Sequence, residues 1–219
     1  ILSSTVMKKN THEKNPARAG RPKSEEKRIA ILNAAGDLFL SRGLAGTSMD
    51  AVGEDAGVSK QTVYSHFSSK EDLFRTCIKN KVESYGFQEE DLPKDADLET
   101  VLKLLGKQFL NLIFDEGVVA MHRVVIGESA SYPKIAELFY ETGPQKTINA
   151  VAKYIDTQMT CKRLKPDNPY YIAVLFLGLV RADYQMQLLM GVQPGLADKD
   201  IELHLSKVVR QFMELYGTQ

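Results

Sequence analysis

The chain has 219 residues, of which 43% are hydrophobic and 26% are charged, and its net charge is zero. These values are ordinary for a globular protein of one or two domains. The longest apolar stretch is interrupted by Arg181 and Asp183, and the first residues lack the apolar core of a signal peptide. Cys77 and Cys161 are isolated from each other and from any histidine cluster, which argues against a disulfide or a metal site. We therefore expect a cytoplasmic protein without a cofactor, a metal or a membrane span.

The N-terminal end of the chain is basic. Residues 1–23 carry six basic side chains and one acidic one, and residues 1–86 together have a net charge of +4, so the remainder has −4. Such a distribution favours a polyanion such as DNA at the N-terminal end. Residues 1–23 have two interpretations. They form either a basic tail without a role or a flexible arm that contacts DNA through Arg18, Arg21 and Lys23. Residues 1–6 precede Met7 and are either native or a remnant of expression.

A helix is predicted over residues 25–42, and two short helices follow it. The capping-box pattern that starts at Thr47 predicts a helix over 48–56. Gly57 ends this helix, because glycine adopts the left-handed conformation without a Cβ penalty. Ser59 caps a further helix over 60–67. Two short helices joined by a glycine turn are typical of a DNA-binding helix-turn-helix.

The outward face of the 60–67 helix suits DNA. Val63 and Phe67 lie four residues apart and are expected to pack inward, which leaves Lys60, Gln61 and Tyr64 on another face. This face contains no carboxylate, so it is suited to base edges and phosphates.

Lys70 lies in the first turn of the next predicted helix, 70–85, which Ser69 caps. A cation at this end opposes the helix dipole, so helix stability alone explains Lys70 poorly. A phosphate partner explains it better.

Three consecutive runs, IAILNAAGDLFLSRGLAGTS, MDAVGEDAGVS and KQTVYSHFSSKEDLF, carry a family resemblance. Residues 22–87 resemble the DNA-binding domain of the TetR/AcrR family of transcriptional regulators. The resemblance implies a helix-turn-helix domain over 24–87 in which Lys60, Gln61 and Tyr64 approach bases. The residues that it places at phosphates are Thr47, Ser48, Thr62, His66 and Lys70. Ser59, the cap of the 60–67 helix, is a further DNA-binding candidate.

Residues 88–97 are acidic and contain Pro93, so we place a domain boundary there. The patterns that follow are helical and not strand-like. They predict helices over 97–114, 118–130, 134–162 with a kink or break at Gly143-Pro144, 170–190 and 199–216. The fold class is therefore all-α, with about nine helices.

Residues 122–144, HRVVIGESASYPKIAELFYETGP, are similar to the C-terminal domain of the AefR-like branch of the same family. This resemblance implies that residues 97–219 form a helical domain that binds a small-molecule effector and forms a homodimer.

The predicted 170–190 helix is apolar around most of its circumference, so it needs two covered faces. Burial within one protomer is one account. A dimer through this helix and the 199–216 helix is the other, and the two-fold symmetry of DNA half-sites favours it. The expected interface residues are Tyr171, Val174, Gly178, Ala182, Leu205, Val208 and Phe212.

Aromatic and apolar residues of the second domain are candidates for an effector pocket with a few polar groups. Most such residues in a helical domain are simply core. The candidates for a partly apolar effector are Phe109, Met121, Arg123, Tyr140, Phe176 and Gln185. The chain contains no GxSxG, no HExxH and no phosphate-binding glycine loop, so no catalytic residue is expected.

We therefore expect a homodimeric repressor that a small molecule releases from a palindromic operator in double-stranded DNA. One alternative is a DNA-binding protein of the same fold that acts through a protein partner. Another is a ligand-binding or enzymatic protein with a vestigial DNA-binding domain.

Overall fold

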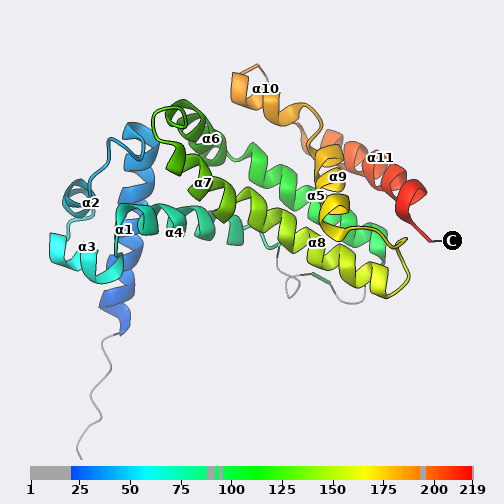
Figure 1. Ribbon diagram of the computed structural model, residues 1–219, viewed down its shortest axis with the longest axis horizontal. Helices are drawn as coiled ribbons and strands as arrows, with labels where there is room; N and C mark the ends of the chain where they lie inside the picture. The colour runs from blue at the N-terminus through cyan, green and yellow to red at the C-terminus, as the bar shows by residue number, and fades with distance from the viewer. Residues whose placement is uncertain (1–20, 88–91, 94–95, 193–195, 219) are drawn as a thin grey trace, which may run out of the picture.

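The computed structural model describes residues 21–87, 92–93, 96–192 and 196–218, and these residues form eleven α-helices. The N-terminal lobe contains α1 (Arg21–Arg42), α2 (Met49–Asp55), α3 (Lys60–His66) and α4 (Lys70–Glu83). Figure 1 shows α4 running from this lobe into the rest of the molecule, so it is the element that joins the two parts.

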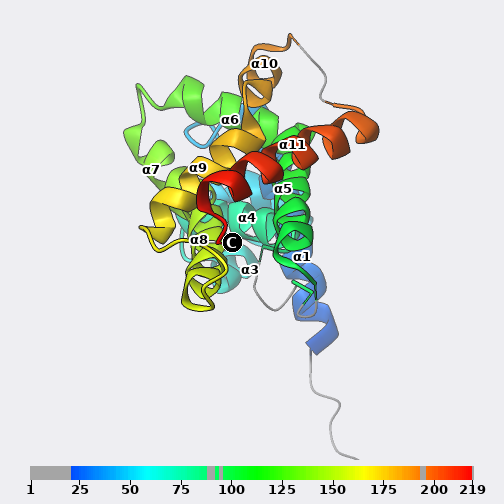
Figure 2. The same ribbon diagram turned by 90° about the vertical axis from the view of Figure 1, so that its right-hand side faces the viewer.

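The larger lobe contains α5 (Leu98–Phe114), α6 (Glu116–Glu128), α7 (Pro133–Thr142), α8 (Pro144–Thr160), α9 (Pro169–Arg181), α10 (Tyr184–Met190) and α11 (Asp198–Tyr216). Helices α8 and α9 pack along each other, and α11 packs on both α5 and α9. Figure 2 shows α11 lying across α5 and α9 at the C-terminal end of the chain. The all-α prediction is confirmed.

Helix starts follow local capping chemistry. The side chains of Ser59, Ser69, Asp97 and Asp115 each accept a hydrogen bond from a backbone N–H in the first turn of their helix. The cap of α2 is Ser48, which accepts from the Ala51 N–H at 3.1 Å. The capping-box prediction for Thr47 was therefore wrong by one residue.

Two predicted helices are divided, which raises the number above nine. The expected break at Gly143-Pro144 separates α7 from α8. A second break, which the sequence pattern did not reveal, separates α9 from α10 at Ala182 and Asp183. Ala182 has φ +45°, a conformation that disfavours side chains with a Cβ and ends the helix.

Two apolar clusters form the core. One lies between α5, α8, α9 and α11, where Phe176 and Phe212 meet edge to face at 5.2 Å. The other surrounds Phe39 and Phe74 in the N-terminal lobe, and it extends without interruption to Ile135 and Leu138 of α7. The second cluster therefore spans both lobes, with α6 packed on α1 and α7 packed on α4.

Among the residues that the structure describes, no single helix is long and apolar enough to cross a membrane. Helices α9 and α10 together reach that length and composition, but they meet at 60°.

Candidate functional site

The position of α3 is fixed by its neighbours in the helix-turn-helix. Gly57 has φ +64° and ends the turn after α2. A Cβ at Gly53 would lie 3.2 Å from both the Val58 carbonyl oxygen and Val63 Cγ2, so glycine lets the turn and α3 approach α2 closely. Val63 is fully buried and Phe67 nearly so. These contacts hold the opposite face of α3 toward solvent.

The exposed face of α3 carries Lys60, Gln61 and Tyr64, and Tyr64 is 48% exposed. Lys60 Nζ lies 2.8 Å from the Asp50 carboxylate and 5.9 Å from the centre of the Tyr64 ring. The hydrogen bond and the negative charge of Asp50 raise the pKa of Lys60. The expectation of a carboxylate-free surface therefore holds for α3 itself but not for the surface it shares with α2.

The candidate phosphate contacts divide into accessible and inaccessible residues. Ser48 and Ser59 are exposed, and Thr62, His66 and Lys70 are half-buried. Thr47 is only 3% exposed, and its hydroxyl donates to the Gly43 carbonyl at 2.7 Å or to the Leu38 carbonyl at 3.2 Å. The Thr47 side chain is thus a buried structural element, which corrects the prediction that it contacts phosphate.

The predicted arm lies largely outside the described residues. Arg18 falls outside them, while Arg21 is the first residue of α1. The side chains of Arg21 and Lys23 are not among those described.

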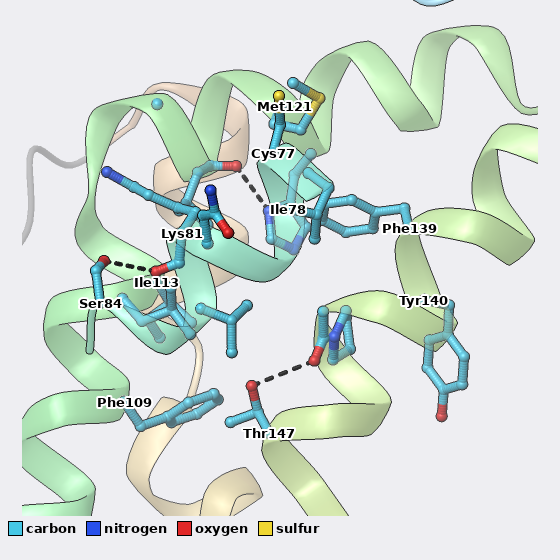
Figure 3. Close-up of a pocket in the computed structure, with 18 of the residues that line it drawn as sticks. Cys77, Ile78, Lys81, Ser84, Phe109, Ile113, Met121, Phe139, Tyr140 and Thr147 are labelled. Atoms are coloured by element: carbon cyan, nitrogen blue, oxygen red, sulfur yellow. Dashed lines mark hydrogen bonds between the residues drawn. The ribbon is translucent and has the colours of Figure 1, made fainter. Parts of the chain in front are cut away.

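A cavity of about 1050 Å³ lies between the two lobes. Its wall combines residues of α1 and α4 with residues of α5 to α10, and Figure 3 shows Phe109 and Thr147 on one side and Ile78 with Phe139 on another. The buried part of the wall is mostly apolar. Its buried apolar side chains are Ile78, Leu112, Ile113, Met121, Phe139 and Leu177, and its buried polar side chain is Thr147. A ligand here would touch the helix-turn-helix lobe and the larger lobe together.

Four of the six candidate ligand residues line this cavity, namely Phe109, Met121, Tyr140 and Gln185. Phe176 does not, because it is fully buried against Phe212. Arg123 does not line the cavity either, because its side chain binds α10. Its Nη2 donates to the Leu188 carbonyl at 2.7 Å and its Nε donates to the Leu189 carbonyl at 3.0 Å.

Sequence reasoning missed the α4 contribution to the cavity. Cys77 and Ile78 line it, and apolar residues at helical spacing cannot be told from ordinary core by their sequence positions alone. Burial raises the pKa of the Cys77 thiol to about 12, so the thiol is a neutral part of the wall.

Charged groups of the cavity lining lie at its rim. Asp37, Lys81 and Arg181 are all exposed residues. The polar groups further inside belong to His122, Gln185 and Thr147. Burial lowers the pKa of His122, against a smaller opposing effect of its hydrogen bond to Val118, so the ring is neutral near pH 7.

Side chains of the larger lobe, namely Glu128, Tyr132 and Asp115, make polar contacts with residues of the N-terminal lobe and the end of α4. The Glu128 carboxylate, at the end of α6, accepts from the Leu44 N–H at 3.1 Å and the Ala45 N–H at 3.4 Å. The Tyr132 hydroxyl donates to Glu71 of α4 at 3.0 Å.

Asp115 forms the third contact, since it accepts from Lys81 Nζ at 2.8 Å and from the Tyr85 hydroxyl at 2.9 Å. Burial alone would raise the pKa of Asp115, but the hydrogen bonds from Lys81, Tyr85 and the Val118 N–H outweigh it and hold the pKa below its ordinary value. Burial and Asp115 raise the pKa of Tyr85 to about 12.

The candidate dimer residues fall into two groups. Tyr171 is 54% exposed and Val174 39%, Gly178 is half-buried, and Ala182 is exposed. Leu205, Val208 and Phe212 are at most 4% exposed and belong to the core of one protomer. They cannot form an interface, because the inward face of α11 is already covered by α5 and α9.

Within the described residues, no three His, Cys, Asp or Glu side chains gather in a way that could hold a metal ion.

Comparison with known proteins gives matches over both lobes. Residues 31–77 match the family of bacterial regulatory proteins named tetR, and residues 100–218 match the C-terminal domain of AefR-like transcriptional repressors. The chain is similar to the transcriptional activator FasR of Mycolicibacterium smegmatis, with 38% identity over 33% of this chain and 35% of FasR. It is also similar to the transcriptional regulator EthR of Mycobacterium tuberculosis, with 30% identity over 64% of this chain and 65% of EthR. These matches span about a third and just under two thirds of the two relatives.

A solved structure gives a longer match. The flavonoid-responsive regulator FrrA is 33% identical, with a TM-score of 0.74 over 89% of this chain and 99% of FrrA.

Proposed function

The chain belongs to the TetR family of bacterial transcriptional regulators, and we propose that it is a repressor that a small molecule releases from a palindromic operator. The observation that carries the proposal is the exposed face of α3, where Lys60, Gln61 and Tyr64 stand on a helix whose other face is locked into the core. A helix presented in this way fits the DNA major groove. The match of residues 100–218 to a repressor domain supports repression.

In the proposed complex, Gln61 and Tyr64 contact base edges and Lys60 leaves Asp50 to reach the DNA. Phosphates are held by Ser48, Ser59, Thr62, His66 and Lys70, with Arg18, Arg21 and Lys23 as an arm. Lys70 makes no ion pair within the described part of the chain, which supports a phosphate partner. A DNA partner also places the protein in the cytoplasm.

We propose a homodimer through the exposed side chains of α9, among them Tyr171 and Val174. Val174 and Gly178 also line the cavity, so the proposed interface borders the proposed effector site. Leu203 and Leu215 are the exposed large apolar residues of α11, and they replace the buried residues expected from the sequence. Two copies related by a two-fold axis would present their α3 helices to half-sites about 34 Å apart.

The cavity is the proposed effector site, and a partly apolar effector fits its lining. A flavonoid-responsive relative with 33% identity supports an effector of that kind. The wall includes α1 and α4 as well as α6 and α7, so an effector that prefers one arrangement of the lobes changes the spacing of the two α3 helices. Release follows from this difference in affinity between the two arrangements.

The experiment is a binding measurement with fragments that the protein retains from the genomic DNA of its source. Lys60→Ala and Tyr64→Ala are each expected to weaken binding to a retained fragment by about tenfold or more, with the folded state intact because both side chains are exposed. Lys146→Ala is the matched control, since Lys146 is exposed on α8. If both α3 variants bind as tightly as the wild type, the proposed interface is wrong.

A further inference from the structure

We propose that the effector is an uncharged, largely apolar ring compound with a hydroxyl group, and that His122 and Gln185 together bind this hydroxyl. The inference rests on the proposed function, because it takes the cavity to be the effector site. Both residues line the cavity, His122 from α6 and Gln185 from α10.

The hydrogen bonds of His122 determine which ring nitrogen faces a ligand. His122 Nδ1 lies 2.8 Å from the Val118 carbonyl oxygen. A carbonyl oxygen only accepts hydrogen bonds, so Nδ1 carries the proton and donates. In the neutral ring the other nitrogen, Nε2, is then an acceptor. The imidazole thus offers the cavity a single acceptor.

The present partner of His122 Nε2 is the amide of Gln185, and the hydrogen bonds of this amide are long. Gln185 Nε2 lies 3.4 Å from His122 Nε2, and Gln185 Oε1 lies 3.5 Å from Arg181 Nη1. Both distances are at the outer limit of hydrogen bonding, whereas a well-formed N–H bond is near 2.9 Å. The amide of Gln185 is therefore free to exchange its present partner for a better one.

A hydroxyl group satisfies both residues at once. Its O–H donates to His122 Nε2, and its oxygen accepts from the Gln185 amide N–H. A carbonyl or a methoxy group only accepts, so it would leave His122 Nε2 without a donor from the ligand. The pair consequently distinguishes a hydroxyl from its methyl ether.

The rest of the wall determines that the ligand is uncharged. The buried lining residues are apolar except for Thr147, whose hydroxyl donates to the Gly143 carbonyl, and the charged lining residues, Asp37, Lys81 and Arg181, are exposed. An ionised group inside would lose its hydration. Arg181 lies next to Gln185, but it is exposed and hydrated, so it would offset this loss only in part. Burial lowers the pKa of His122 for the same reason, because a charged group at this position loses hydration.

Aromatic contacts around His122 favour a ring. The His122 ring meets Phe139 edge to face, with centroids 4.8 Å apart and an interplanar angle of 80°. The polarisable Met121 precedes His122 on α6 and also lines the cavity, and Phe109 faces the cavity from another side. Such surroundings bind a flat ring through edge and face contacts.

The test uses calorimetry on the full-length protein without DNA, so its result does not depend on operator binding. The probes are flavone, 4′-hydroxyflavone and 7-hydroxyflavone, and the methyl ether of each hydroxyflavone. At least one hydroxyflavone is expected to bind about fivefold to tenfold more tightly than both flavone and its own methyl ether. His122→Phe, which keeps a ring against Phe139 but has no acceptor, is expected to abolish that preference.

Two further variants complete the design. Gln185→Met removes the amide at similar size and is expected to reduce the same preference, and it serves if His122→Phe fails to fold. His204→Phe is the matched control: His204 is also half-buried and packs on an aromatic ring, Tyr184, but it does not line the cavity. The control is expected to keep the wild-type preference.

Three results would overturn the inference: no binding by any probe, equal binding of hydroxyflavone and methyl ether, or a preference that survives in both His122→Phe and Gln185→Met. None of them bears on DNA binding by α3, which is measured separately. Loss of DNA binding by the wild type would instead contradict the proposed function.

Discussion

Glu128 connects the larger lobe to the N-terminal lobe, and its removal should weaken the coupling between the two lobes. The carboxylate accepts from the backbone N–H groups of Leu44 and Ala45, in the segment between α1 and α2. A hydrogen bond to a charged group contributes about 1.5–3 kcal/mol. The Ala45 bond is long at 3.4 Å and its residue is exposed, so we count only the Leu44 bond and take the lower end, about 1.5 kcal/mol, which is roughly tenfold in an equilibrium constant.

Glu128→Ala is therefore expected to lower the thermal midpoint by about 3–6 °C for a chain of this size. It should also reduce, by up to about tenfold, the factor by which the effector weakens operator binding. Differential scanning calorimetry gives the first quantity, and fluorescence anisotropy of a labelled operator with and without effector gives the second. Glu137→Ala is the control, since Glu137 pairs with Lys134 on the exposed face of α7. A Glu128→Ala protein with the wild-type midpoint and an unchanged effector response would show that this contact does not couple the two lobes.

Three other predictions test separate parts of the structure. Lys70→Ala should reduce the slope of log affinity against log salt for operator binding by about one unit, measured by anisotropy, because one phosphate contact is lost. In the folded state the pKa of Asp115 lies below its ordinary 3.8. The stabilisation by ionised Asp115 is therefore complete above pH 3.8 and is lost as the pH falls through the folded-state pKa. Urea unfolding below pH 3.8 should show a smaller loss of stability for Asp115→Asn than for the wild type, and identical pH profiles of the two proteins would count against the contact. In thiol titration at pH 8, the exposed Cys161 should react quickly and the half-buried Cys77 slowly, because burial raises the pKa of the Cys77 thiol to about 12.

The helix-turn-helix was predictable because its signals are local. Ser59 and Ser69 are caps and Gly57 ends its helix, as their sequence positions indicate. The ion pair between Asp50 and Lys60 was not predictable, because it joins residues ten apart across a turn whose geometry the spacing does not give. For the same reason the burial of Thr47 was not predictable, since its hydroxyl contacts the Leu38 and Gly43 carbonyls at the end of the preceding helix.

The sequence predicts the helices of the larger lobe but not which face of each helix is buried and by which neighbour. Helical periodicity shows that α11 has an apolar stripe but not what covers it, so Leu205 and Phe212 were assigned to a partner although α5 and α9 bury them. The break at Ala182 depends on a positive φ at an alanine, which composition does not suggest. Residues of α1 and α4 line the cavity together with residues of the larger lobe. The sequence does not show that the two lobes meet there, so the α4 lining residues could not be distinguished from ordinary core residues.

The most direct test of the central claim is genome-wide DNA binding by the wild type beside Tyr64→Ala. Sheared genomic DNA of the source organism, passed over each purified protein and sequenced, gives the retained sites. The account predicts a few promoter sites with palindromic half-sites, retained by the wild type, lost in Tyr64→Ala and released by an effector. Retention of no fragment, of dispersed sites outside promoters, or of the same sites by both proteins would contradict it.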